Sequence, residues 1–302
     1  MTRAPAIVHA FSDEAGPARA LAAALGIDCM FVDVHEFPDG EVLPTVPSTA
    51  ETTIVYRSLA RPNDKLLPLI LACDAWRRAG AQRLILVSPY MCYLRQDAAF
   101  LDGQPVSQKV IGDILGERFD RIITVDPHLH RTHSISAVFP QTAASHISAA
   151  PAIADWLAMN RRNLDFVVGP DIESEPWVAQ VAQALERPYR LFTKTRLGDT
   201  EVRLDLTSPH EFSGRNVALV DDICSSGGTL IEAAKRLKDA GALEITVCVT
   251  HALFSEAVGE RLRAAGAATL ASTDSVIHPT NAIALAALLA IEVRNALHSP
   301  RR

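Results

Sequence analysis

Short apolar runs alternate with amphipathic segments of helix length along nearly the whole chain. Ala6–Ala10 precedes Ala15–Leu25, and Arg83–Pro89 precedes Ser107–Leu115. A strand that is repeatedly followed by a helix favours parallel pairing, with helices on both faces of the sheet. The sequence therefore predicts an α/β fold, and its 302 residues predict two doubly wound, mostly parallel-sheet domains of ordinary size.

One stretch interrupts this alternation and favours a domain boundary. Phe139–Ala152 contains Pro140, Pro151 and many small residues, so we place the boundary near residue 150. The Ala- and Leu-rich segment Asn281–Leu297 is expected to form the last helix, within the C-terminal domain.

Composition excludes several classes of protein. The net charge is −6 and the basic residues are dispersed, which argues against a general nucleic-acid binder. No apolar run approaches the roughly 18 residues that span a bilayer, and the N-terminus lacks the apolar core of a signal peptide. The five cysteines are widely spaced and form no metal-binding pattern. We therefore expect a cytoplasmic protein with no membrane partner.

The segment from Val217 to Thr229 carries the strongest functional signal. The apolar run Val217–Val220 leads into Asp221 and Asp222, and the small-residue sequence Cys224-Ser-Ser-Gly-Gly-Thr229 precedes a segment with helical periodicity. Glycines and the free amides of a helix start can together surround a phosphate. The sequence thus predicts an anion-binding loop.

The two carboxylates narrow the choice of ligand. Facing a phosphate directly, they would repel it by several kcal/mol at an effective dielectric constant of about 20. They are therefore expected to face hydroxyl groups or a metal ion, as in a site for ribose 5-phosphate. The plainer alternative is an Asp-rich turn that caps a helix.

Other polar residues follow predicted strands, where ligands gather in such sheets. Arg95 could bind a phosphate and Gln96 a base edge, although an Arg near Asp97 can also form a surface ion pair. His128 suits a metal ligand or a structural histidine, and Asp171 suits a ligand contact or a helix cap.

Two further loops carry cations. Lys194 and Arg196 follow a predicted strand and could close over a transferring phosphoryl group, whereas the alternative is a solvated hairpin. Ser58, with the helix start that follows it, could hold a second phosphate. The chain lacks the GxxxxGK[ST] and GxGxxG phosphate-binding motifs, so any nucleotide site uses another design.

Taken in order, these segments resemble the ribose-phosphate diphosphokinases, or PRPP synthetases, over nearly the whole chain. The loop at 221–229 resembles the ribose 5-phosphate loop that this family shares with type I phosphoribosyltransferases. The N-terminal half favours the synthetases, because phosphoribosyltransferases have no counterpart of its segments. These are Phe37-Pro-Asp-Gly-Glu41, Arg61-Pro-Asn-Asp64, Pro89-Tyr90 with Tyr93, Arg95-Gln-Asp97 and Asp126-Pro-His128. The sequences of two further segments, Gly169–Trp177 and Lys194–Val202, are more similar to archaeal-type members than to the common bacterial ones.

The resemblance implies a role for each matching segment. Residues 1–150 would form the ATP-site and oligomerisation domain, and residues 151–302 a phosphoribosyltransferase-like domain that binds ribose 5-phosphate. It implies Mg²⁺ as cofactor and a dimer-based homo-oligomer. The implied residues are Phe37, Asp39, Glu41, Arg95, Gln96 and Asp97 for ATP; His128 and Asp171 for Mg²⁺; Lys194 and Arg196 for catalysis; and Asp221, Asp222, Ser225, Ser226, Gly227, Gly228 and Thr229 for ribose 5-phosphate.

The implied reaction moves the diphosphoryl group of MgATP to the anomeric hydroxyl of ribose 5-phosphate, giving PRPP and AMP. Two other classes stay open, namely a phosphoribosyltransferase and a non-catalytic regulatory relative. Because the peripheral sequence diverges, a related pentose phosphate also stays open as the acceptor. Ala98-Ala99 stands where relatives usually carry basic residues, which leaves open how strongly the chain binds the triphosphate.

Overall fold

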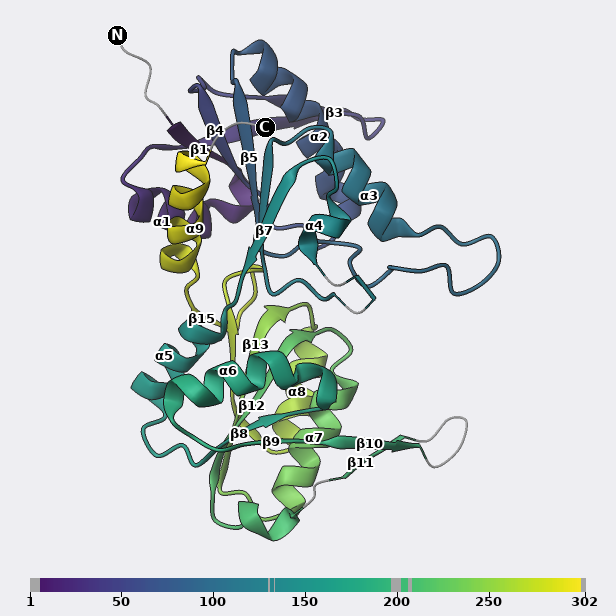
Figure 1. The fold of residues 1–302 in the computed structure, drawn as a ribbon, viewed down its shortest axis with the longest axis vertical. Helices are drawn as coiled ribbons and strands as arrows, with labels where there is room; N and C mark the ends of the chain where they lie inside the picture. Colours follow the sequence, from purple (N-terminus) through teal and green to yellow (C-terminus); the bar gives the residue numbers. More distant parts are fainter. Residues whose placement is uncertain (1–5, 130, 133, 197–201, 206–207, 300–302) are drawn as a thin grey trace. The chain divides into compact units, whose positions relative to one another are not determined.

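The chain folds into two compact units. The computed structural model describes residues 6–129, 131–132, 134–196, 202–205 and 208–299. Unit 1 comprises Met1–Ile147 and Leu285–Arg302, and unit 2 comprises Ser148–Ala284. Each unit contains a mostly parallel sheet with helices packed on it, as Figure 1 shows, which confirms the predicted α/β class.

Unit 1 has a seven-stranded sheet of order β3-β2-β1-β4-β5-β6-β7. Its strands are β1 Ala6–Phe11, β2 Cys29–Glu36, β3 Val42–Thr45, β4 Thr52–Tyr56, β5 Arg83–Ser88, β6 Arg121–Val125 and β7 Ala143–Ile147. Every neighbouring pair is parallel except β2 with β3. Its helices are α1 Ala15–Leu25, α2 Pro62–Arg78, α3 Ser107–Gly116, the short α4 Ile135–Val138 and α9 Ala286–His298, and a 3₁₀ turn, η1, spans Ser12–Glu14.

The central strands of unit 1 are buried along their whole length. Every residue of β1, β4 and β5 is buried, as expected for parallel strands that are covered on both faces. Trp76 of α2 packs with Leu84 and Leu86 of β5 in the core beneath the sheet. Because these strands are buried throughout, a ligand can reach only the polar residues that follow their ends.

Unit 2 has a six-stranded sheet of order β15-β14-β13-β12-β8-β9, in which all pairs are parallel. The strands are β8 Phe166–Gly169, β9 Tyr189–Leu191, β12 Asn216–Cys224, β13 Glu244–Ala252, β14 Ala267–Thr273 and β15 Asn281–Ile283. A separate antiparallel hairpin joins β10 Thr193–Arg196 to β11 Val202–Asp205. The helices are α5 Ala150–Asn160, α6 Glu175–Leu185, α7 Gly228–Asp239 and α8 Glu256–Ala264, with 3₁₀ turns η2 Ile172–Ser174 and η3 Pro209–Phe212.

The two units divide between Ile147 and Ser148, within the stretch Phe139–Ala152 where the sequence favoured a boundary, but a strand and a helix differ from the sequence-based expectation. The same stretch contains β7, an edge strand whose residues are half-buried or exposed, so its apolar signal is weak. Helix α9 belongs to unit 1, although the sequence analysis grouped it with residues 151–302. Glu292 of α9 accepts from Arg121 at 3.2 Å and from Ser145 at 2.6 Å. The functions predicted for the two domains stay predictions.

Among the described residues, no helix combines the length and the apolar character that a membrane span requires.

A buried histidine makes the stability of unit 1 depend on pH. His9 of β1 is fully buried, and Trp76 Nε1 donates to its Nδ1 at 2.7 Å. Burial lowers the pKa of His9 from 6.5 to about 4, against a smaller opposing effect of a backbone hydrogen bond at Ser48. Between these two values the unfolded chain binds a proton that the folded chain does not, so the free energy of unfolding falls as the pH falls.

We expect His9→Asn to weaken this dependence, because Asn keeps an acceptor for Trp76 but has no proton to bind. The wild type should lose up to about 3 kcal/mol more than the variant as the pH falls through this range. Urea unfolding at a series of pH values measures the difference. The exposed His146→Asn is the control. Equal slopes for the wild type and His9→Asn would contradict the assignment.

Candidate functional site

Three carboxylates gather at one edge of the sheet in unit 2. Strands β8 and β12 are parallel neighbours, with Leu219 paired to Val168, so their carboxyl ends lie at the same edge. Asp171 follows β8, and Asp221 and Asp222 lie within β12. The strand therefore continues past the predicted Val217–Val220, because the backbone groups of these polar residues still pair with β13.

Asp171 also has the capping role that the sequence left open. Its Oδ1 accepts from the backbone N–H of Glu173 at 3.0 Å and from that of Ser174 at 3.3 Å, at the start of η2. These bonds fix the orientation of the carboxylate at the strand end. A ligand contact and a helix cap are thus compatible in one residue.

The neighbouring acids affect the ionisation of Asp221. Desolvation raises the pKa of Asp221 well above its ordinary value, and repulsion from Asp222 and Asp171 raises it further. Asp222 is almost fully buried, at 3% exposure. The charged form of a buried carboxylate is stabilised by hydroxyl donors or by a cation and is destabilised by a phosphate.

The loop after β12 has the geometry of an anion-binding site. Cys224 ends the strand, and its carbonyl accepts from the backbone N–H of Leu253 at 2.8 Å. Gly227 has φ +72°, and a Cβ there would lie 2.5 Å from Val258 Cγ1, so a side chain does not fit. Ser225 and Ser226 are exposed.

Helix α7 begins at Gly228 directly after this loop. Its first turn, which is fully described, carries no acidic residue. The first amides of a helix have no partner within the helix and attract anions. The residues from Ser225 to Thr229 thus lie together at a helix start, next to the carboxylates of β12.

Lys194 and Arg196, the predicted catalytic residues, belong to strand β10 of the hairpin. Lys194 pairs with Leu204 and Arg196 pairs with Val202. Residues 197–201, between the two strands, lie outside the described residues. The catalytic role of Lys194 and Arg196 stays a prediction.

In unit 1, the predicted nucleotide residues Phe37, Asp39 and Glu41 form a tight turn between β2 and β3. The backbone N–H of Phe37 donates to the carbonyl of Glu41 at 2.8 Å, and Asp39 Oδ1 accepts from the N–H of Glu41 at 3.2 Å. The ring of Phe37 meets that of His35 edge-on, with centroids 4.5 Å apart. The turn presents Phe37, at 38% exposure, at its surface.

The second predicted nucleotide segment, Arg95 to Asp97, follows β5. Arg95 and Gln96 are exposed, whereas the side chain of Asp97 is only 2% exposed and pairs with Arg131. Desolvation opposes the ionisation of Asp97, but the hydrogen bonds from Arg131 outweigh it and lower the pKa of the carboxyl group.

The predicted metal residues belong to different units, His128 to unit 1 and Asp171 to unit 2. His128 follows β6 and is half-buried. Among the described residues, no three His, Cys, Asp or Glu side chains are grouped as a metal centre. The carboxylate of Asp171 is the kind of ligand that Mg²⁺ prefers, and imidazole is a secondary choice.

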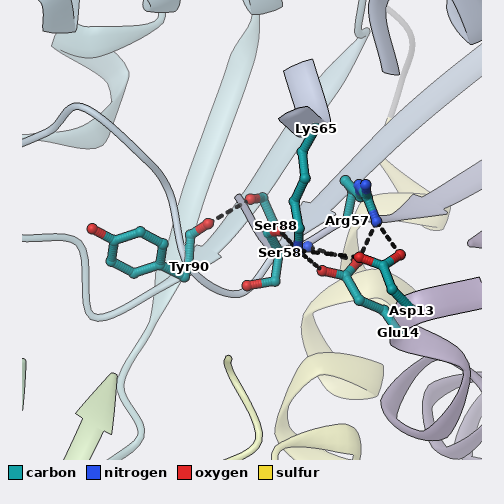
Figure 2. Close-up of polar contacts among 7 residues, drawn as sticks. All are labelled: Asp13, Glu14, Arg57, Ser58, Lys65, Ser88 and Tyr90. Atoms are coloured by element: carbon teal, nitrogen blue, oxygen red, sulfur yellow. Dashed lines mark hydrogen bonds and ion pairs between the residues drawn. The ribbon is translucent and has the colours of Figure 1, made fainter. Parts of the chain in front are cut away.

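A buried charged cluster underlies the strand ends of unit 1 (Figure 2). Glu14 accepts from Lys65 Nζ at 2.5 Å and from the backbone N–H of Ser58 at 3.1 Å, and Arg57 pairs with Asp13 and Glu14. Burial raises the pKa of Glu14, while Lys65 and Arg57 act in the opposite direction. Removing one partner from such a buried cluster typically costs about 3–5 kcal/mol.

The cluster holds the connection between β4 and α2 in place. Lys65 Nζ donates to the carbonyl of Ser58 at 2.8 Å, and the backbone N–H of Leu59 donates to Tyr90 at 2.8 Å. Ser88 Oγ donates to the same carbonyl of Tyr90 at 2.9 Å. The segment that leads to Arg95 is thus tied to a fixed neighbour.

Sequence reasoning did not single out Asp13, Glu14, Lys65 or Arg131. The position of Asp13 and Glu14 directly after an apolar strand was an available signal, because that strand end lies at the ligand edge of the sheet. Nothing in the sequence pairs Arg131 with Asp97, which lies 34 residues earlier.

Two family models together cover most of the chain. Residues 7–118 match the N-terminal domain of ribose phosphate pyrophosphokinase, and residues 144–270 match the phosphoribosyl transferase domain. The chain is 35% identical over 294 residues to a ribose-phosphate pyrophosphokinase of Methanopyrus kandleri, covering 96% of this chain and 99% of that protein. It is 36% identical over 232 residues to one of Pyrococcus abyssi, covering 76% and 79%.

A solved structure has the same fold. The phosphoribosylpyrophosphate synthetase of Mycobacterium smegmatis superposes with a TM-score of 0.80 at 24% identity, covering 97% of this chain and 99% of that one. This likeness confirms the predicted architecture of two parallel-sheet domains.

The repulsion at Asp221 leads to a prediction about stability. Because its pKa is raised in the folded state, the wild type loses stability as the pH rises above the ordinary value of 3.8. Asp221→Asn removes this loss and keeps an oxygen for the backbone N–H of Asp222, which donates to it at 3.0 Å. We expect the variant to melt about 2–4 °C higher at neutral pH.

Calorimetric melting at neutral and acidic pH measures the effect. The gain should disappear near pH 4, where the wild-type carboxyl group is protonated as well. Asp155→Asn, at an exposed position of α5, is the control. A lower melting temperature for Asp221→Asn at neutral pH would show that the carboxylate is compensated in the folded protein.

Proposed function

This chain belongs to the ribose-phosphate pyrophosphokinase family, and we propose that it transfers the diphosphoryl group of MgATP to the anomeric hydroxyl of ribose 5-phosphate, giving PRPP and AMP. The matches confirm the predicted family and its similarity to archaeal members. The observation that carries the proposal is the presence of both family domains in one chain. A phosphoribosyltransferase alone would leave residues 7–118 unexplained.

The acceptor half of the reaction is assigned to the edge of unit 2. Amides and hydroxyls from Ser225 to Thr229 would hold the 5-phosphate, and Asp221 and Asp222 would accept hydrogen bonds from the ring hydroxyls. The raised pKa of Asp221 supports this division, because hydroxyl donors relieve the repulsion and a phosphate would increase it. A related pentose phosphate would use the same groups.

The donor half is assigned to unit 1. Phe37 offers an aromatic face to adenine, Asp39 and Glu41 offer oxygens to ribose hydroxyls, and Arg95 offers a bidentate contact to phosphate. Gln96 would contact the base. The exposure of Phe37, Arg95 and Gln96 supports this assignment, since a ligand can reach them.

The donor chemistry of the predicted metal residues fits Mg²⁺. Asp171 would contribute a carboxylate ligand beside substrate oxygens, because proteins usually bind Mg²⁺ through one or two carboxylates and the phosphates of the substrate. His128 would contribute an imidazole, and its role as a ligand stays a prediction. When bound, it would neutralise charge on the triphosphate.

The transfer itself requires positioning and charge stabilisation more than covalent chemistry. The anomeric oxygen forms a bond to the β-phosphorus, the bond from that phosphorus to the α,β-bridging oxygen breaks, and AMP leaves. The hydroxyl proton passes to solvent. Lys194 and Arg196 would stabilise the negative charge that grows on the transferring group.

Two features of the molecule outside the site stay predictions. The family resemblance leads us to expect a dimer-based homo-oligomer, which light scattering of the purified protein would measure. The composition leads us to expect a cytoplasmic location.

The reaction itself is tested by incubating the purified protein with MgATP and a panel of pentose phosphates. We expect AMP to form with ribose 5-phosphate in the amount of PRPP made. Consumption of PRPP with a nucleobase, without any need for ATP, would identify a phosphoribosyltransferase instead. Binding of nucleotide without AMP from any sugar would identify a regulatory relative.

The hairpin cations are tested by Lys194→Ala and Arg196→Ala. Because they would act on charge that develops in the transition state, each variant should lose about 100-fold or more in kcat, with KM for either substrate nearly unchanged. Steady-state kinetics separates the two constants. Normal turnover in both variants would remove them from the catalytic machinery.

A further inference from the structure

A polar network in unit 1 joins the segment of Arg95 and Gln96 to the segment that follows His128. Asp97 accepts from the backbone N–H of Arg131 at 3.0 Å and from its guanidinium at 2.9 Å. One carboxylate thus binds both the main chain and the side chain of one residue. The arrangement fixes where that residue lies relative to residues 95–97.

Gln108 of α3 makes a second link between the same two segments. Its Nε2 donates to the carbonyl of Leu94 at 3.1 Å, and its Oε1 accepts from Thr132 Oγ1 at 2.8 Å. The residue is buried, at 7% exposure. Leu94 precedes the predicted nucleotide residues and Thr132 follows Arg131. Gln108 and the Asp97–Arg131 pair therefore connect the same two segments, residues 94–97 and residues 131–132.

The start of α3 also orients Gln96. Ser107 Oγ donates to Gln96 Oε1 at 2.8 Å, and the backbone N–H of Gln108 donates to the carbonyl of Gln96 at 3.1 Å. With its oxygen engaged by Ser107, the Gln96 amide presents Nε2 as a donor. A donor at this place suits the ring nitrogens of adenine, which are acceptors.

The coverage of the Asp97 side chain indicates a structural use of this residue. Its side chain is 2% exposed, whereas that of Arg131 is 53% exposed and lies over the ring of Phe100, 5.4 Å from the centroid. A carboxylate that is covered by its own cation is poorly placed to touch a nucleotide. Charge-assisted hydrogen bonds of this kind are among the stronger ones in proteins.

We propose that Asp97, Arg131 and Gln108 are positioning residues that hold Gln96 and the segment after His128 in one arrangement for the nucleotide. Asp97 then acts through its neighbours and is not itself a ligand of ATP. The inference rests on the proposed function, since it gives these three residues a part in binding the donor substrate.

The test compares Asp97→Asn, Arg131→Gln and Gln108→Leu with the wild type. Losing a charge-assisted bond should raise KM for ATP by roughly tenfold in the first two variants, while KM for ribose 5-phosphate changes less than about twofold. Since both variants break one interaction, the double variant Asp97→Asn/Arg131→Gln should be no worse than the poorer single one. Arg131→Lys keeps the charge and should recover part of the loss.

Lys109→Gln is the matched control. It neighbours Gln108 on α3, and its ion pair with Asp113 is exposed and lies outside the network. It should leave both KM values unchanged. Melting temperatures of all variants identify any that fail to fold, and Arg131→Gln, at a half-exposed side chain, then carries the test.

The outcomes separate this inference from the proposed function. A wild type that makes AMP, with unchanged KM for ATP in Asp97→Asn and Arg131→Gln, overturns the positioning role alone. Additive losses in the double variant overturn it too, because they mean separate contacts with the nucleotide. A wild type that makes no AMP overturns the proposed function, and calorimetric titration of ATP into the same variants then decides the positioning role; absence of ATP binding overturns both.

Discussion

The site of unit 2 depends on the parallel pairing of β12 with its two neighbours. Hydrogen bonds to β13 continue through Asp221 and Cys224, so the strand carries polar residues to the edge where its ligands are expected. The loop that follows must turn within a few residues, and Gly227 is the position where a side chain would collide with Val258. Helix α7 then presents its amides beside the carboxylates. Sheet register thus decides which chemical groups meet.

In unit 1, ion pairs fix the groups at the strand ends. Its strand ends are held by two acids and two bases, of which only Asp13 is largely exposed, and these leave little net charge beneath the connection that starts at Arg57. At the edge of unit 2, burial and the neighbouring acids Asp222 and Asp171 raise the pKa of Asp221. Opposite charges thus surround the strand ends of unit 1, whereas acids lie together at the strand ends of unit 2.

Periodicity was sufficient to predict the parallel strands and the long helices, because buried runs such as β5 are continuous and apolar. Periodicity did not reveal β7, an edge strand of half-buried and exposed residues within the stretch that was interpreted as a domain boundary. The residues proposed for the anion-binding loop could be named from the sequence, since strand, loop and helix are consecutive in the chain. The network around Asp97 could not be predicted, because Arg131 reaches Asp97, and Gln108 reaches Leu94 and Thr132, only in the folded unit.

The contrast between Asp97 and Asp221 explains why a sequence motif alone does not assign roles to carboxylates. Both follow or end an apolar strand, and both were expected to contact substrate. Hydrogen bonds from Arg131 outweigh the desolvation of Asp97 and lower its pKa, whereas desolvation and neighbouring acids raise that of Asp221. A satisfied carboxylate orders the chain around it. A carboxylate whose ionisation is opposed by burial and by neighbouring acids is stabilised further by hydroxyl donors or a cation, which is the property that a substrate site needs.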